Sequence, residues 1–170
     1  MRVLVTASSK HRATGEIAAE IGRVLGDRSL DAVVIPLEDV GDVSGFDAFV
    51  VGSAVYAGRW MGDARRFADR HAAQLAARPT WLFSSGPIGN PPKPDAQSAV
   101  KLDDVIARTG AREHRLFAGR LDRSVLGFGE RTVVRMVGAA DGDYRDWRAV
   151  RAWAGAIGDV LTSSVAEAAR

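Results

Sequence analysis

The stretch VLVTASSKHRAT at residues 3–14 decides the fold of this chain. Its short apolar run predicts a buried strand, and a loop rich in hydroxyls and bases follows. Ile17, Ala18 and Ile21 then lie on one face of a predicted helix. A helix that begins directly after such a loop offers free N–H groups and partial positive charge. The stretch therefore predicts a phosphate-binding loop that ends at Thr14.

The residue types of this loop narrow the kind of phosphate site. The loop has neither the Gly-x-Gly-x-x-Gly pattern of dinucleotide folds nor the Gly-Lys-Ser/Thr pattern of nucleoside triphosphatases. Ser8, Ser9 and Thr14 can donate neutral hydrogen bonds, which suits a phosphomonoester. The alternative is that they only cap the helix, since Ser and Thr are favoured there. We favour the phosphate, because a cap needs one hydroxyl and Lys10 and Arg12 add positive charge.

Composition bounds the class of protein. A chain of 170 residues with 46% hydrophobic residues predicts a single domain over residues 1–170. The absence of cysteine excludes disulfides and thiolate chemistry, and no histidine spacing supports a metal site. A net charge of +2 is too small to indicate a nucleic-acid partner. No apolar run of about 18 residues or signal peptide occurs, so we expect a cytoplasmic protein.

Apolar runs and helical periodicities alternate along the chain. Strands are predicted at residues 2–6, 32–36, 48–52, 80–84 and 114–118, and helices at 14–25, 62–77, 96–108 and 146–161. The segment 37–46 contains two glycines and is predicted to be a loop with at most a helical turn. Such alternation predicts an α/β fold: a doubly wound, five-stranded parallel sheet in the order 2-1-3-4-5, with helices on both faces.

Ligands of such sheets bind where the loops after strands 1, 3 and 4 converge. In the second loop, Tyr56 or Trp60 can stack on a flat ring, and Gly58 permits close approach of the backbone. The alternative for Trp60 is packing against the helix that follows. The third loop, rich in glycine and proline, can present backbone donors to polar ring edges. A phosphate loop beside an aromatic loop predicts FMN as the ligand.

The candidate contacts to FMN follow from these three loops. They are Ser8, Ser9, Lys10, His11, Arg12, Ala13, Thr14, Ser53, Ala54, Val55, Tyr56, Gly58, Trp60, Ser85, Gly86, Pro87, Ile88 and Gly89. No side chain is assigned a catalytic role, because the flavin ring itself carries the redox chemistry and the protein positions it.

The pattern Ser9-x-x-x-x-Thr14-x-x-x-Ala18-x-x-Ile21 resembles the FMN-phosphate signature of the flavodoxin family. The chain departs from that signature at two positions: flavodoxins commonly have an aromatic residue where it has Ala7, and glycine where it has Arg12. The side chain of Arg12 can supply charge to the phosphate or point to solvent. The resemblance implies a flavodoxin-like fold that binds FMN.

The chain resembles one branch of flavodoxin-domain proteins more closely than it resembles the flavodoxins themselves. This branch contains menaquinone-dependent protoporphyrinogen dehydrogenase, and the resemblance covers nearly the whole chain. The matching pieces are residues 8–10, 53–58, 117–120 and 133–147. The resemblance implies an FMN-dependent oxidoreductase that passes electrons from a porphyrinogen-like substrate to a quinone-like acceptor. Two alternatives stay open. One is a flavodoxin-type electron carrier, which meets a redox partner protein, and the other is a flavin-free binding or regulatory module.

Residues 122–145 form a 24-residue insertion after the fifth strand, where a minimal sheet of this type needs only a short connection. Apolar and arginine residues interleave there, and a short amphipathic helix is predicted at 129–137. Its apolar face can pack on the domain. Alternatively, the insertion forms a lip over the flavin that meets a porphyrin, a quinone or the membrane surface, where arginine suits carboxylates or anionic lipid.

Overall fold

Five parallel strands form the centre of the computed structural model, which describes residues 1–86, 100–121 and 142–168. The strands are β1 (Arg2–Ser8), β2 (Asp31–Pro36), β3 (Ala48–Tyr56), β5 (Thr80–Gly86) and β6 (Glu113–Ala118). They lie in the order β2-β1-β3-β5-β6, which confirms the predicted doubly wound order. In this order β1 pairs with both β2 and β3, so it occupies the position where the connections switch direction.

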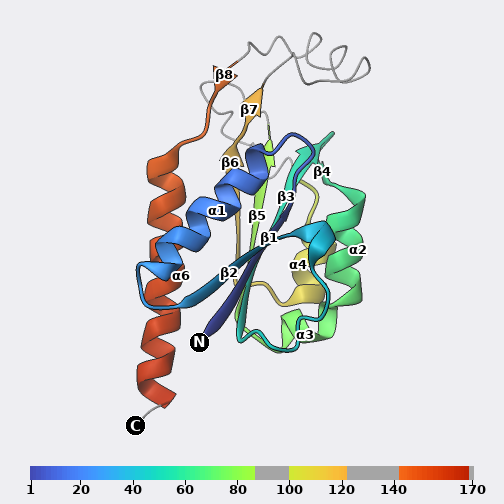
Figure 1. Ribbon diagram of the computed structural model, residues 1–170. Coiled ribbons are helices and arrows are strands. Elements are labelled where there is room, and N and C mark those ends of the chain that lie inside the picture. The colour runs from blue at the N-terminus through green and yellow to red at the C-terminus, as the bar shows by residue number, and fades with distance from the viewer. Residues whose placement is uncertain (87–99, 122–141, 169–170) are drawn as a thin grey trace.

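Helices cover both faces of this sheet (Figure 1). On one face lie α1 (Ala13–Gly26) and α6 (Trp147–Ala168), and on the other lie α2 (Gly62–Arg70), α3 (Ala72–Ala76) and α4 (Asp103–Thr109). Two-sided cover explains why the strand sequences are continuous apolar runs rather than alternating ones. In β1, the side chains of Val3, Leu4 and Val5 are all fully buried.

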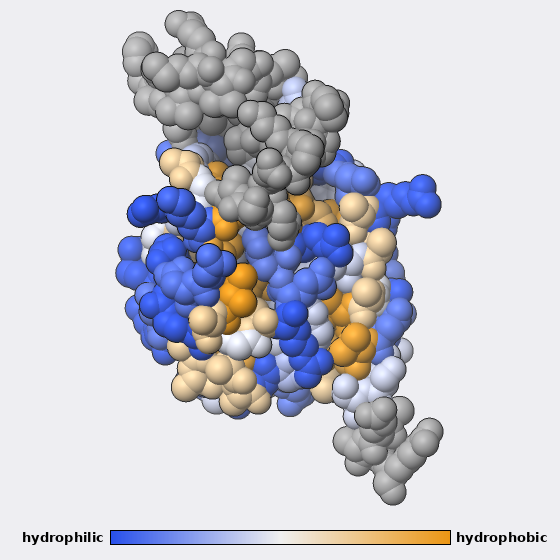
Figure 2. All heavy atoms as spheres, turned by 180° about the vertical axis from the view of Figure 1, so that it is seen from behind, coloured by the Kyte–Doolittle hydropathy of each residue, from blue (hydrophilic) through white to orange (hydrophobic). Residues whose placement is uncertain are grey.

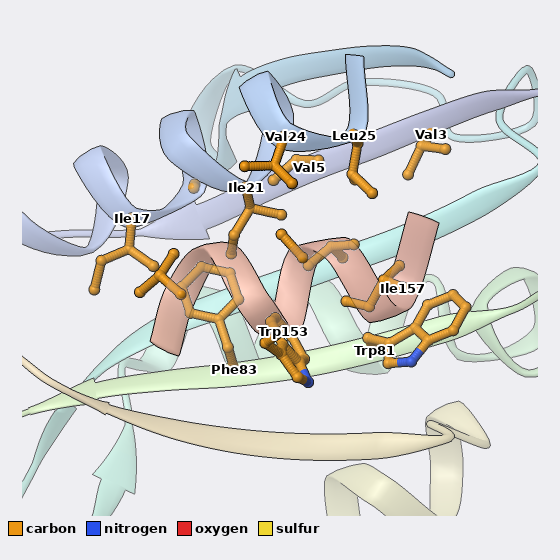
Figure 3. Packing of buried hydrophobic residues seen from close by; sticks show 14 of the residues in the cluster. Val3, Val5, Ile17, Ile21, Val24, Leu25, Trp81, Phe83, Trp153 and Ile157 are labelled. Atoms are coloured by element: carbon orange, nitrogen blue, oxygen red, sulfur yellow. The ribbon is translucent and has the colours of Figure 1, made fainter. Parts of the chain in front are cut away.

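The hydrophobic core is divided by the sheet into two clusters. The cluster under α1 and α6 includes Val5, Ile21, Phe83 and Trp153 (Figure 3). There the rings of Phe83 and Trp153 meet edge to face, with centroids 6.3 Å apart. Gly52 makes this packing possible, because a Cβ at that position would lie 2.1 Å from the ring of Phe83. The cluster on the other face includes Leu4, Phe49, Trp60, Phe67 and Leu82.

Several element boundaries differ from the sequence prediction. The strands β1, β3 and β5 continue two to four residues further than expected, and β3 turns back into the short antiparallel strand β4 (Arg59–Trp60) instead of entering a loop. The helix predicted at 62–77 breaks at His71, whose φ of −106° and ψ of 15° separate α2 from α3. In the described part of the helix predicted at 96–108, α4 starts at Asp103 and Val100–Leu102 are not helical, while residues 96–99 lie outside the described residues.

Two smaller features complete the described part. The short 3-10 helix η1 (Leu37–Asp39) confirms the single helical turn expected in segment 37–46. The strands β7 (Arg120–Leu121) and β8 (Gly142–Asp143) pair antiparallel and join the two ends of the predicted insertion. The helix predicted at 129–137 lies outside the described residues.

In residues 1–86, 100–121 and 142–168, no helix has the length and apolarity needed to cross a bilayer. On the face shown in Figure 2, hydrophilic side chains surround scattered apolar ones. This is the ordinary pattern of a surface in contact with water.

Candidate functional site

The carboxyl ends of β1, β3 and β5 lie side by side next to the start of α1 (Figure 1). The sheet register aligns Ser8 with Ser53, and Ser53 with Ser84. Ala54 is aligned with Ser85 in the same way. The described parts of the three predicted loops therefore converge at one edge of the sheet, as expected for strands of this order.

The first segment, between β1 and α1, leaves the helix N-terminus without a side-chain cap. Arg12 is the N-cap residue, and its side chain makes no capping hydrogen bond. The first intrahelical bond runs from the N–H of Glu16 to the carbonyl of Arg12 at 2.9 Å. Because neither Ser9 nor Thr14 occupies the cap, the capping alternative does not describe this helix. The N–H of Ala13 donates to the carbonyl of His11 at 2.8 Å, and those of Thr14 and Gly15, which have no intrahelical partner, suit an anion.

Arg12 adopts a backbone conformation that normally favours glycine. Its φ of 65° and ψ of −21° place it in the left-handed region. Holding an arginine in this conformation costs about 1 kcal/mol relative to glycine, which adopts it without a steric clash. The side chains of both Lys10 and Arg12 are exposed, whereas Thr14 is buried.

Ser8 and Ser9 have different surroundings although they are neighbours. The Ser8 hydroxyl lies 2.8 Å from both carboxylate oxygens of Asp63 and 3.3 Å from the sulfur of Met61. Ser8 ends a strand, so its side chain shares the face of Leu4, on which α2 begins. Ser9 lies against the other helix: a Cβ built on Gly15 would be 4.0 Å from the Cβ of Ser9. Of these two residues, Ser9 is the one beside the first turn of α1.

The second segment is a tight hairpin. Ala57 and Gly58 connect β3 to β4 with φ values of 48° and 73°, and two positive φ angles are the mark of a type I′ turn. Beneath the turn, the Ser53 hydroxyl accepts a bond from the N–H of Met61 at 3.0 Å and donates to the carbonyl of Ala54 at 2.8 Å. Tyr56, next to the turn, is 41% exposed. The hairpin thus holds an aromatic ring at the edge of the sheet.

Trp60 points into the core rather than into the site. It is 3% exposed, and its indole N–H donates to the Ser84 hydroxyl at 2.8 Å. The Ser84 hydroxyl lies 2.8 Å from Nε2 of His114. Burial lowers the pKa of His114 to about 4, against a small opposing effect of Glu113. Because an indole only donates, the Ser84 hydroxyl accepts from Trp60, and it can donate its own proton to Nε2 of His114 when that nitrogen carries no proton. Trp60 therefore has the packing role weighed above as the alternative to ring stacking.

The third segment is described only at its start. Ser85 is 4% exposed, and a Cβ on Gly86 would lie 3.3 Å from the Cβ of Val55. The carbonyl of Gly86 accepts a bond from the N–H of Gly119 at 2.9 Å. These contacts hold the end of β5 against its neighbours. Pro87, Ile88 and Gly89, which complete the predicted contacts, lie outside the described residues.

Two residues at this edge had no role in the sequence analysis. Asp63 accepts the hydroxyl of Ser8, and Arg145 joins β8 to the first turn of α1 through Glu16. Acidic residues are common at the start of a helix because they stabilise the positive end of its dipole. The sequence therefore does not indicate that Asp63 also pairs with Ser8. Arg145 is 129 residues from Glu16, and one sequence contains no sign of that pairing. In the part of the chain that the structure describes, no cluster of acids and histidines could hold a metal ion.

Comparison with known proteins gives a family and a set of similar folds. A family model described as a flavodoxin domain matches residues 4–147. A flavodoxin from the domain Archaea has a TM-score of 0.64 at 15% identity, with 95% of this chain and 99% of that chain covered. A Streptococcus pneumoniae flavodoxin has a TM-score of 0.60 at 16% identity, with 96% of this chain and 99% of that chain covered. Rubredoxin oxygen:oxidoreductase from Desulfovibrio gigas has a TM-score of 0.65 at 11% identity. That match covers 97% of this chain but only 37% of the other chain. No curated protein sequence matches.

Proposed function

The chain belongs to the flavodoxin-domain family, and from this premise we propose that it is an FMN-dependent dehydrogenase that oxidises an organic substrate and reduces a quinone-like acceptor. Membership of the family implies FMN as the cofactor and an electron-transfer or oxidoreductase function. When bound, FMN supplies the ring that accepts and gives up electrons. The observation that carries the proposal is the uncapped N-terminus of α1 at the carboxyl edge of the sheet.

The residues present at this edge fit the phosphate of FMN. The first turn of α1 has backbone donors without a side-chain cap, Ser9 lies beside that turn and Thr14 lies in it. Lys10 and Arg12 are exposed cations on the same loop. In the proposed site, the N–H groups and hydroxyls hold the phosphate oxygens, while Ser8 stays with Asp63.

The hairpin fits the flat ring of FMN. Tyr56 stands exposed beside the type I′ turn, and its ring can cover one face of a flavin. Trp60 supports the hairpin from below through its bond to Ser84. Ser85 and Gly86 end the neighbouring strand and can approach the ring from the other side. The protein therefore binds and orients the ring with an aromatic face and backbone groups, and excludes water with the hairpin.

The resemblance to the protoporphyrinogen dehydrogenase branch supports a porphyrinogen-like substrate. The pieces that carry it include residues 53–58, which form the hairpin, and residues 142–147, which join β8 to α6. The strands β7 and β8 pair at the two ends of the insertion, and Arg145 ties them to the first turn of α1. Both ends of the insertion therefore lie beside the proposed cofactor site. We place the protein in the cytoplasm, in peripheral contact with the membrane that contains the quinone.

A flavodoxin-type carrier is the second candidate function. Two flavodoxins match almost from end to end, with 99% of each of those chains covered. A carrier would accept electrons from a partner protein and would not oxidise an organic substrate. This candidate needs the same FMN site and a docking surface for the partner.

An anaerobic half-reaction separates the two functions. The protein is reconstituted with FMN, mixed with protoporphyrinogen without oxygen, and followed by its visible flavin absorbance. Loss of this absorbance, and its return on adding a menaquinone analogue, supports the dehydrogenase. Bound FMN that protoporphyrinogen does not reduce, but a flavodoxin reductase does, contradicts the dehydrogenase and supports the carrier. Failure to bind FMN contradicts both and favours a flavin-free module.

A further inference from the structure

Arg145 is a buried cation that connects β8 to the N-terminal turn of α1. Its side chain is 4% exposed. Its Nε and Nη2 donate to the two carboxylate oxygens of Asp143 at 2.8 and 2.6 Å. Its Nη1 donates to Glu16 at 2.6 Å and lies 3.4 Å from the carbonyl oxygen of Ala13. The guanidinium also lies 4.6 Å from the ring centroid of Trp147. One side chain thus contacts the start of α6, the strand β8 and the first turn of α1.

The charges around Arg145 bear on the phosphate site. Glu16 lies in the first turn of α1, where its carboxylate competes with any incoming anion for the positive end of the helix. Arg145 neutralises that carboxylate from one side, and Nη1 of Arg120 lies 3.8 Å from its other oxygen. The pKa of Asp143 is lowered mainly by its hydrogen bond from Arg145, and the pKa of Arg145 is raised mainly by Asp143. Asp143 and Arg145 therefore favour their charged forms in each other's presence.

The same contacts also fix the geometry of the turn. The Arg145 guanidinium is planar, its side chain is nearly fully buried, and it meets Glu16, the fourth residue after the N-cap residue Arg12. The carbonyl of Ala13 belongs to the first residue of the helix, directly before Thr14. Because the Arg145 guanidinium bonds to both the Glu16 carboxylate and the Ala13 carbonyl, it restricts how far the N–H groups of this turn can move. Such positioning is what a dianionic ligand needs from backbone donors.

We propose that Arg145 is a positioning residue for the phosphate of the cofactor. It neutralises Glu16 and holds the first turn of α1, so that this helix end stays positive and correctly oriented for the anion. Arg145 acts through Glu16 and Ala13 and does not touch the ligand. This inference rests on the proposed FMN site at α1, and it adds that the segment ending in β8 controls phosphate binding.

The test compares two ligands that differ only in the phosphate. The dissociation constants of FMN and riboflavin are measured for the apoprotein and for Arg145→Gln, by quenching of flavin fluorescence. In the variant, the carboxylate of Glu16 stays in the first turn of α1 but loses the nearer of the two cations that pair with it in the described part of the chain, and Arg120 at 3.8 Å remains. We expect FMN affinity to fall about tenfold or more, and riboflavin affinity to change less than about twofold. A purely structural role would weaken both ligands equally.

Two further variants keep the test decisive if Arg145→Gln weakens the fold. Glu16→Gln in the Arg145→Gln background removes this carboxylate, and we expect it to restore most of the lost FMN affinity. Arg148→Gln is the matched control, because Arg148 is an exposed arginine in the first turn of α6. We expect the control to bind both flavins like the unchanged protein.

The outcomes separate this inference from the proposed function. If the unchanged protein binds neither flavin, the FMN site itself is wrong. If it prefers FMN and Arg145→Gln keeps the same preference, the site stands and the role of Arg145 is wrong. Equal loss of both flavins, or no recovery with Glu16→Gln, also overturns the proposal.

Discussion

The two sides of the candidate site are built in different ways. The phosphate side depends on charge: an uncapped helix end, exposed cations and the buried side chain of Arg145 paired with Glu16. The ring side depends on packing and backbone: a type I′ hairpin held from below by the buried Trp60. Because salt screens charges but leaves buried apolar contacts largely unchanged, the two sides should respond differently to substitution and to solution conditions.

The largest effect is expected on the packing side. Trp60→Ala removes a buried ring and leaves the Ser84 hydroxyl without its indole donor. We expect the free energy of unfolding to fall by about 3–5 kcal/mol, measured by urea denaturation. The loss should be the same at low and high salt. A loss below about 1 kcal/mol would show that Trp60 does not hold the hairpin.

The next effect concerns pH and the same buried network. The pKa of His114 is about 4 in the folded protein, below its ordinary value of 6.5, because burial disfavours the charged ring. The unfolded chain therefore binds this proton more tightly, and the stability is present above about pH 6.5 and lost as the pH falls towards 4. After allowance for screening of a partly exposed ring, the loss is about 2 kcal/mol.

Denaturation at several pH values measures this effect. His114→Gln keeps a polar partner for Ser84 and cannot gain a proton, so its stability should fall less between pH 6.5 and 4 than that of the unchanged protein. Parallel pH profiles of the two proteins would show that His114 is not responsible.

A smaller effect is expected on the phosphate side. Ser9→Ala together with Thr14→Val removes two hydroxyl donors beside the first turn of α1 and should weaken FMN binding by about 0.5–1.5 kcal/mol for each. Riboflavin binding serves as the control and should change little. The loss of FMN affinity should depend on salt, in contrast to the effect of Trp60→Ala. Unchanged FMN affinity would place the anion elsewhere.

The smallest effect is expected at Arg12. Arg12→Gly relieves the left-handed backbone conformation but increases the freedom of the unfolded chain, so the two contributions nearly cancel. We expect a gain in stability of about 0.5 kcal/mol, measured as a small rise in Tm. A clear loss of stability would mean that the arginine side chain, rather than the backbone, holds this loop.

The comparison also shows what the sequence could predict. The strand order follows from apolar runs such as Val3–Val5 and the alternation of strands with helices, and it is confirmed. The sequence predicts a loop from Ser53 onward, because Ser53 and the small residues around it resemble loop residues, whereas β3 continues to Tyr56. In the structure, Ser53 is buried and both of its hydrogen bonds are local. A polar side chain satisfied in this way can continue a strand.

The long-range contacts could not be predicted. The pairing of Arg145 with Glu16 and that of Ser8 with Asp63 depend on how the helices pack on the sheet. The packing role of Trp60 was one of two open interpretations, since nothing local shows which way an indole next to a turn points. The loop sequence thus predicts the phosphate side of the site. The residues that support this side, Arg145 and Asp63, are identified only from the fold.

The most direct test of the whole account is a titration of the purified apoprotein with FMN and, separately, with riboflavin. The account predicts that one FMN binds per chain, and that riboflavin binds about 100-fold more weakly because it lacks the phosphate held by α1. An apoprotein that takes up no flavin, or that binds both flavins equally well, would contradict it.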